Sequence, residues 1–334
     1  ADLSEVFGRY WQDYLKDATP EEWPLYLRPL VKKLGRPLEV LLGYLREWKA
    51  ALDDDDPAQQ IEWAEYIQFR QSGTADVEKG QFRTTPADVP VELGPYVASI
   101  VQASRLREVR AQVGFSRIHP RGGTFGAPGQ ELGRLSLTSR GWLPAIALLG
   151  EGIFLRLDMD RLRAWEARDD VQDRARPMVG EVTARLRPPP IDGEEPEPVS
   201  PGIAARFVLL HSLAHALMRQ LSLDCGYSSS ALRERLYVGD PPHDMAGLLV
   251  HTGSPDSEGT LGGLVRQGGP DRMWETFGGA VRQMAWCSSD PVCITETATL
   301  SSPLNRAACH ACLLVPETSC QHFNVLLDRA LLVG

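Results

Sequence analysis

The spacing of apolar residues predicts helices in the first part of the chain. After Pro37, apolar residues recur at the intervals of one helix face: Leu38, Leu41, Leu42, Leu45 and Trp48. A second helix is expected over residues 59–71, with Ile61 and Phe69 on one side. The polar stretch that follows, to about Val89, predicts a surface loop. We therefore expect a helical region over residues 1–90.

The pattern changes to mixed α and β in residues 91–187. The segment 97–113 has helical spacing, whereas residues 145–149 and 153–157 are short apolar runs typical of buried strands. Gly150 to Gly152 separate these two runs, and a further helix is expected to hold Leu162 and Trp165.

An acidic, proline-rich segment follows at residues 188–201 and predicts a linker between domains. Residues 202–334 are then expected to form a C-terminal module. Its predicted elements are helices over 203–223, 273–286 and 323–332 and a strand over 247–250. The expected fold class is therefore α/β, mixed and helix-rich.

The longest apolar run, residues 203–223, is not expected to cross a membrane. It contains the polar side chains Arg206, His211, His215 and Arg219, which are costly at bilayer depth. No segment has the pattern of a secretory signal, so a cytoplasmic protein is expected. The chain starts at Ala1 rather than Met, which indicates a fragment or a processed form.

Charge argues against a protein that coats nucleic acid by net attraction. Lysine and arginine total 35 against 44 acidic residues, and the formal net charge is −9. A local basic surface remains compatible with this balance. The candidate DNA-backbone contacts are arginines: Arg105, Arg107, Arg110, Arg117 and Arg121. A solvated protein face explains the same cluster equally well.

The cysteines carry the strongest chemical signal. All six lie in the C-terminal part, and Cys309 and Cys312 form a C-x-x-C knuckle of the kind that binds zinc. Cys320 is expected to be the third ligand, and Cys293 or Cys287 the fourth. Disulfides are disfavoured without a secretory signal, whereas spacing alone leaves an iron–sulfur cluster open. Four cysteine ligands leave no open position, so the expected zinc is structural.

His211 and His215 are separated by four residues, which places both imidazoles on one helix face. The glutamate of H-E-x-x-H metalloproteases is absent, and apolar residues share the same face. Packed, hydrogen-bonded histidines are therefore favoured. The alternative is a nuclease or phosphodiesterase that uses this pair with acidic residues such as Asp256 and Glu258.

Several C-terminal segments resemble the zinc-binding module of MrfA-type DNA repair helicases. The matching segments are residues 209–217, 225–230, 254–264 and 308–312, together with Cys320. In that family a four-cysteine zinc site closes the module. No helicase motif is found in this chain.

The chain is more similar to the DrmB family of the DISARM anti-phage defence system. Residues 114–118, 143–154, 286–293 and 327–332 carry this resemblance, which extends over roughly residues 65–334. It implies a non-catalytic partner of a helicase-like ATPase of the DrmA type, in a complex that binds DNA. A protein-interaction scaffold without DNA contact is a further alternative. Loop-closure entropy favours Cys293 over Cys287 as the first zinc ligand.

Overall fold

The chain divides into two compact units in a computed structural model, residues 1–70 and residues 71–334. The structure describes residues 22–34, 37–39, 41–43, 45, 57–72, 82–112, 114, 135, 142–187, 196–241, 243–252, 263–295 and 304–333. In the first unit, α2 (Trp23–Leu34) and α4 (Pro57–Arg70) are helices. The helix predicted over residues 59–71 is therefore confirmed.

The second unit is built on a five-stranded antiparallel sheet with the order β1-β2-β3-β5-β4. The strands are β1 (Arg83–Ala87), β2 (Val97–Ala111), β3 (Ala145–Leu157), β4 (Leu232–Gly239) and β5 (Met245–Thr252). The helices are α5 (Met159–Glu166), α6 (Asp169–Ala175), η2 (Arg176–Met178), α7 (Val179–Leu186), α8 (Pro201–Cys225), α9 (Gly263–Gln267), α10 (Pro270–Met284), α11 (Val292–Thr295), η3 (Glu317–Ser319) and α12 (Ala330–Val333). The predicted mixed α/β class is confirmed.

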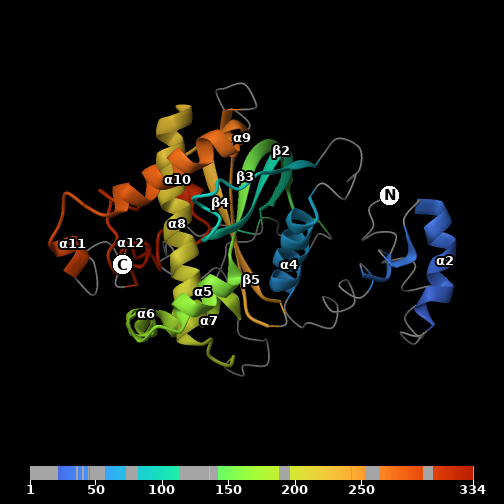
Figure 1. Cartoon of the computed structure of the whole chain (residues 1–334), viewed down its shortest axis with the longest axis horizontal. Helices are drawn as coiled ribbons and strands as arrows, with labels where there is room; N and C mark the ends of the chain where they lie inside the picture. Colours follow the sequence, from blue (N-terminus) through green and yellow to red (C-terminus); the bar gives the residue numbers. More distant parts are fainter. Residues whose placement is uncertain are drawn as a thin grey trace. The chain divides into compact units, whose positions relative to one another are not determined.

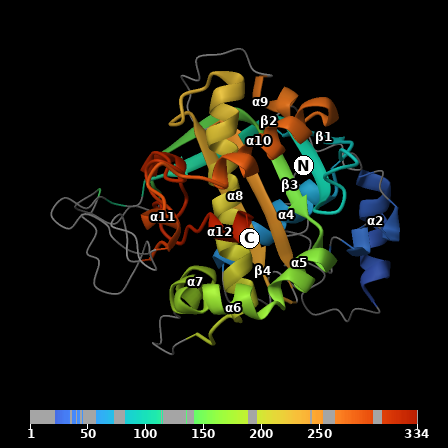
Figure 2. The ribbon, with the colours of Figure 1, turned by 60° about the vertical axis from the view of Figure 1, so that its left-hand side comes forward.

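The long helix α8 lies across the sheet and forms the centre of this unit (Figures 1 and 2). It packs on β4 and β5, while α5, α6, α7, α10 and α12 pack on its other sides. Ser200 caps its first turn by accepting a hydrogen bond from the Ile203 main-chain nitrogen at 3.2 Å. Gly226 ends it in the left-handed conformation, with φ of 72°. The predicted helix over residues 203–223 is confirmed.

By length and composition alone, α8 is apolar enough to cross a membrane. However, 89% of its most apolar window is buried inside the fold. This burial is that of a core helix, and it agrees with the expectation that this segment does not span a membrane.

The helix expected over residues 97–113 is wrong, because most of this segment forms the long strand β2. Pairing with β3 along nearly its whole length satisfies the main-chain groups, and this tertiary contact overrides the apolar spacing. The loop expected before Val89 also contains an unpredicted strand, β1. Pro86 is tolerated there because β1 is the edge strand.

The two predicted strands around Gly150 and Gly152 are one continuous strand, β3. The glycines do not interrupt the strand but allow β5 to approach it. A Cβ atom at Gly150 would lie 2.5 Å from the Thr252 hydroxyl, and one at Gly152 would lie 3.0 Å from three atoms of β5. Glycine therefore marks a close backbone approach here rather than a turn.

The helix predicted over residues 323–332 is reduced to the short α12. Phe323, Asn324 and Leu326 have positive φ values between 55° and 63°, which a continuous helix does not permit. These backbone turns allow the C-terminal segment to fold closely around α8.

The predicted linker at residues 188–201 is followed by elements that join the same sheet as those before it. β3 precedes the linker and β5 follows it, and the two strands pair from Gly152 to Arg156. Residues 188–195 lie outside the described residues. Independent folding of residues 202–334 stays a prediction, while residues 71–334 share one core.

Arg206 forms a buried ionic network at one end of α8. Only 2% of its side chain is exposed, and it donates hydrogen bonds to both carboxylate oxygens of Glu166 and to Asp244. It also donates to the carbonyl oxygens of Gly239 and Met245. One side chain thus connects α5, α8 and the β4–β5 turn.

We expect Arg206→Met to lower the free energy of unfolding by about 3–5 kcal/mol, because it leaves the buried Glu166 carboxylate unpaired. Replacing both partners, in Arg206→Met/Glu166→Leu, is expected to recover part of this loss. Urea unfolding followed by circular dichroism measures both effects. The exposed Arg168–Asp170 pair is the control, and Arg168→Ala is expected to leave the unfolding midpoint nearly unchanged. An Arg206→Met variant as stable as this control would contradict the assignment.

Candidate metal centre

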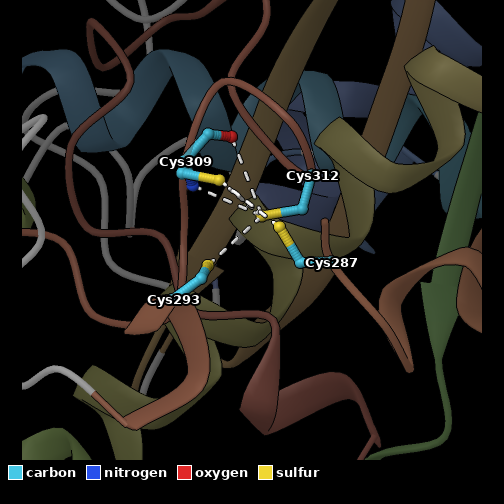
Figure 3. A group of neighbouring side chains, drawn as sticks. All are labelled: Cys287, Cys293, Cys309 and Cys312. Atoms are coloured by element: carbon cyan, nitrogen blue, oxygen red, sulfur yellow. Dashed lines mark hydrogen bonds between the residues drawn. The ribbon is translucent and has the colours of Figure 1, made fainter. Parts of the chain in front are cut away.

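Four cysteine sulfurs converge in the C-terminal part of the fold. Their ligand atoms all lie within 4.8 Å of one another. The Sγ–Sγ distances are 3.5 Å for Cys287–Cys309, 3.7 Å for Cys309–Cys312 and 3.8 Å for Cys293–Cys312. The sulfurs point toward one another from separate segments (Figure 3). Cys287 follows α10, Cys293 lies in α11, and the other two form the knuckle.

These distances fit a tetrahedral metal site and not disulfides. Sulfurs about 2.3 Å from one zinc ion are about 3.8 Å apart in a tetrahedron, whereas a disulfide bond is about 2.05 Å. All four cysteines are free. Because four thiolates complete the coordination, zinc held here would stabilise the fold and leave no position for a reacting water.

Neighbouring groups hold the cysteine segments in place. The Cys287 main-chain nitrogen donates to Asp290 Oδ2 at 2.8 Å, and Asp290 forms an ion pair with Arg329. Arg329 also donates to the Met284 carbonyl at 2.8 Å and lies beside Cys293. Its positive charge is well placed to offset the net negative charge of a zinc–tetrathiolate centre.

The pKa values of Cys293, Cys309 and Cys312 are shifted in different directions. Burial opposes ionisation of Cys309, but hydrogen bonds from Cys287 and the main chain outweigh it and lower its pKa to about 7. Burial raises the pKa of Cys293 to about 11 and also raises that of Cys312. A divalent cation resolves this difference, because it replaces the protons that buried thiols otherwise keep.

The structure changes the expected ligand set at one position. Cys293, Cys309 and Cys312 come together as predicted, and Cys287, the alternative ligand, completes the group. Cys320 is buried elsewhere, against His211. The segment from the end of α10 to α11 brings both Cys287 and Cys293 to the cluster, so both join the group although loop length favoured Cys293 alone.

The predicted histidine pair lies in the packed interior of the fold. His211 and His215 are both fully buried on α8, and burial lowers the pKa of His211 despite the attraction of Glu234. Their side chains meet Glu234 and Cys320 rather than solvent. Asp256 and Glu258, the acidic partners of the nuclease alternative, lie outside the described residues. The pair therefore offers no accessible place for a nucleic-acid substrate.

The candidate DNA-binding arginines are only partly placed. Arg105 and Arg107 are exposed on β2, whereas Arg110 forms a two-pronged ion pair with Glu108 at 2.7 and 2.8 Å. Arg117 and Arg121 lie outside the described residues.

The sequence did not indicate Glu234, because a lone glutamate in a strand carries no motif. The histidine pair His211 and His215, which Glu234 contacts, was the available signal.

Comparison with known proteins supports a zinc-binding domain in this part of the chain. Residues 213–313 match the MrfA Zn-binding domain. This range contains all four clustered cysteines and excludes Cys320. The domain match and the four-cysteine geometry together support structural zinc.

A second comparison extends over most of the chain. The DISARM protein DrmB of Bacillus paralicheniformis is 34% identical over 296 residues, which is 87% of this chain. The aligned region is 51% of that relative, so the chain spans about half its length. The resemblances to DrmB and to the MrfA zinc-binding module are confirmed.

We expect Cys312→Ser to remove about one zinc ion per chain and to lower the midpoint of thermal unfolding by roughly 10 °C, because structural zinc contributes directly to folding. Plasma mass spectrometry measures the zinc, and differential scanning calorimetry the unfolding. Cys225→Ser is the matched control, since Cys225 is half-buried and lies outside the four-cysteine cluster. Unchanged zinc and stability in Cys312→Ser would exclude this site.

Proposed function

We propose that this chain is a non-catalytic accessory subunit of a helicase-like ATPase in bacterial anti-phage defence, and that it acts in the cytoplasm in a complex that binds DNA. The observation that carries the proposal is the 34% identity to DrmB across 87% of the chain. The name of that relative, DISARM protein DrmB, assigns the relative to the DISARM defence system. The zinc-binding domain adds a second connection, to MrfA.

The chemistry of the described residues supports a structural rather than a catalytic role. The two groups of cysteine, histidine and acidic side chains found there are mostly buried, and each is closed by its own four members. A catalytic metal centre needs an open coordination position, and a general acid or base must reach the substrate. ATP-driven movement along DNA would then be the activity of the helicase-like partner.

The outer part of the β2–β3 pair is the best described surface for a partner or DNA. Arg107 and Leu149 lie directly opposite each other, so their side chains project from the same face. Val109 shares this face because it is two residues from Arg107. Val109 and Leu149 are 58% and 50% exposed. Exposed apolar side chains beside arginines suit a macromolecular contact better than a purely solvated face.

Co-purification tests the accessory role. We expect this chain and a helicase-like ATPase of the DrmA type from the same organism to elute together in size-exclusion chromatography. We also expect the complex to bind DNA more tightly than either protein alone. Separate elution, or DNA cleavage by the chain alone, would contradict the proposal.

We expect Arg105→Ala/Arg107→Ala to weaken DNA binding by that complex and to reduce the dependence of log affinity on log salt by about two, about one for each lost phosphate contact. Fluorescence anisotropy over a range of salt concentrations measures this slope. Arg168→Ala is the control, because it removes an exposed arginine from another element. An intact complex with unchanged DNA affinity would favour the scaffold alternative.

A further inference from the structure

A second group of potential metal ligands lies beneath α8. It contains His211 and His215 from α8, Glu234 from β4 and Cys320, which follows η3. All four side chains are buried, and their ligand atoms lie within 4.8 Å of one another. His211 Nε2 is 3.1 Å from Glu234 Oε1 and 3.2 Å from Cys320 Sγ. His215 Nε2 is 3.4 Å from the same carboxylate oxygen.

The hydrogen bonds of the two imidazoles orient their lone pairs toward the centre of this group. His211 Nδ1 faces the Leu326 carbonyl oxygen at 3.3 Å, and His215 Nδ1 faces that of Leu313 at 2.9 Å. A carbonyl oxygen only accepts, so each Nδ1 carries the proton. In a neutral imidazole the Nε2 atom then presents a lone pair. Metal-binding histidines are commonly held by such a bond from the second ring nitrogen.

Without a cation, this arrangement is unfavourable. Two neutral imidazoles would point two nitrogen lone pairs at one carboxylate oxygen. A single proton on His211 pairs that ring with Glu234 but still leaves the lone pair of His215 Nε2 facing the same oxygen, and protonating both imidazoles would bury two positive charges against one negative charge. Two polar atoms of the group, His215 Nε2 and Glu234 Oε2, have no hydrogen-bond partner in the described part of the chain. Eight buried side-chain atoms lack such a partner among the described residues, and five of the other six are arginine Nε atoms; within this group the two atoms are a potential nitrogen ligand and a potential oxygen ligand.

The main-chain hydrogen bonds at Cys320 suit a metal-bound thiolate, although burial and the nearby Glu234 raise the pKa of the metal-free thiol well above its usual range. Its sulfur accepts hydrogen bonds from the main-chain nitrogens of His322 and Asn324 at 3.3 and 3.2 Å. A similar bond joins the Cys309 nitrogen to Cys312 Sγ in the zinc knuckle. The positive φ values at Phe323 and Asn324 create the turn that aims these nitrogens at the sulfur.

We propose that His211, His215, Glu234 and Cys320 bind a second, structural zinc ion. Zinc–nitrogen and zinc–oxygen bonds of about 2.1 Å and a zinc–sulfur bond of about 2.3 Å give tetrahedral edges of about 3.4–3.6 Å. The distances of 3.1, 3.2 and 3.4 Å lie within about 0.4 Å of these edges, so small side-chain shifts accommodate the ion. One carboxylate and one thiolate neutralise the charge of Zn²⁺, so the buried site is neutral overall. Mixed nitrogen, oxygen and sulfur ligands suit zinc better than the hard cations Mg²⁺ and Ca²⁺.

This site is separate from the four-cysteine cluster. The two groups share no residue, and His211 and Cys320 lie outside the region that matches the MrfA Zn-binding domain. The second ion would join the central helix, the edge strand β4 and the C-terminal segment. His215 also bonds to Leu313, the residue after Cys312, so the two centres are mechanically connected.

Zinc K-edge X-ray absorption of the full chain tests the proposal on the unaltered protein. Two occupied sites predict about two zinc ions per chain and an average of about 2.5 sulfur and 1.5 nitrogen or oxygen ligands per zinc, since five of the eight ligands are sulfur. Protein purified from zinc-supplemented medium that holds about one zinc, with an all-sulfur shell of about four, would overturn the proposal.

Cys320→Ser provides the matching variant. We expect it to lose about one of the two zinc ions, and we expect the remaining zinc to have about four sulfur ligands. Cys225→Ser is the matched control and is expected to keep both ions. A Cys320→Ser variant that retains both zinc ions with the ligand average unchanged would overturn the proposal. If this variant does not fold, the spectrum of the unaltered chain still decides between one site and two.

Discussion

The almost complete burial of α8 from Gly202 to Met218 is the constraint on which residues 71–334 depend. This part of the helix excludes water, so its polar side chains must find partners in other elements. Those partners tie the helix to distant parts of the chain. The pairs are Arg206 with Glu166, His211 with Leu326, Ser212 with Asp328, His215 with Leu313 and Arg219 with Ala311. The apolar surface of α8 holds the core together, while these polar side chains fix where each neighbouring segment lies.

The sequence predicted the elements whose signals are local, and it failed where tertiary contacts decide. α8 was predictable because its cap, its apolar run and its terminal glycine agree. β2 was not, since its apolar residues fit a helix spacing and only pairing with β3 makes them a strand. Gly150 and Gly152 were interpreted as a break between two strands, because glycine is common in turns. Their role in letting β5 approach β3 closely becomes visible only when β5 lies beside them.

The metal site shows the same division. The knuckle Cys309–Cys312 is a local motif and was predictable, and so was its role in holding zinc. Cys293 and Cys287 were candidates only as alternatives to each other, and Cys320 was expected as a ligand beside one of them. A cysteine count does not show that the segment between α10 and α11 brings both to the cluster while a tight turn carries Cys320 to the histidines. Glu234 had no sequence signal, since its partners come from two other segments. Ligands supplied by separate segments become recognisable only when the fold brings them together.

The connectivity of the sheet also determines the order in which this protein can fold. β3 pairs with β5 across α5 to α8 and β4, so the sheet closes only after all of these elements have been synthesised. Pairings of such long sequence separation form slowly. Until β4, β5 and the C-terminal helices arrive, the faces of α8 that pack on them remain exposed on the growing chain, where they are prone to aggregation. A chaperone, or a partner protein that binds early, has its longest opportunity to act in this interval, before the last cysteines of the cluster leave the ribosome.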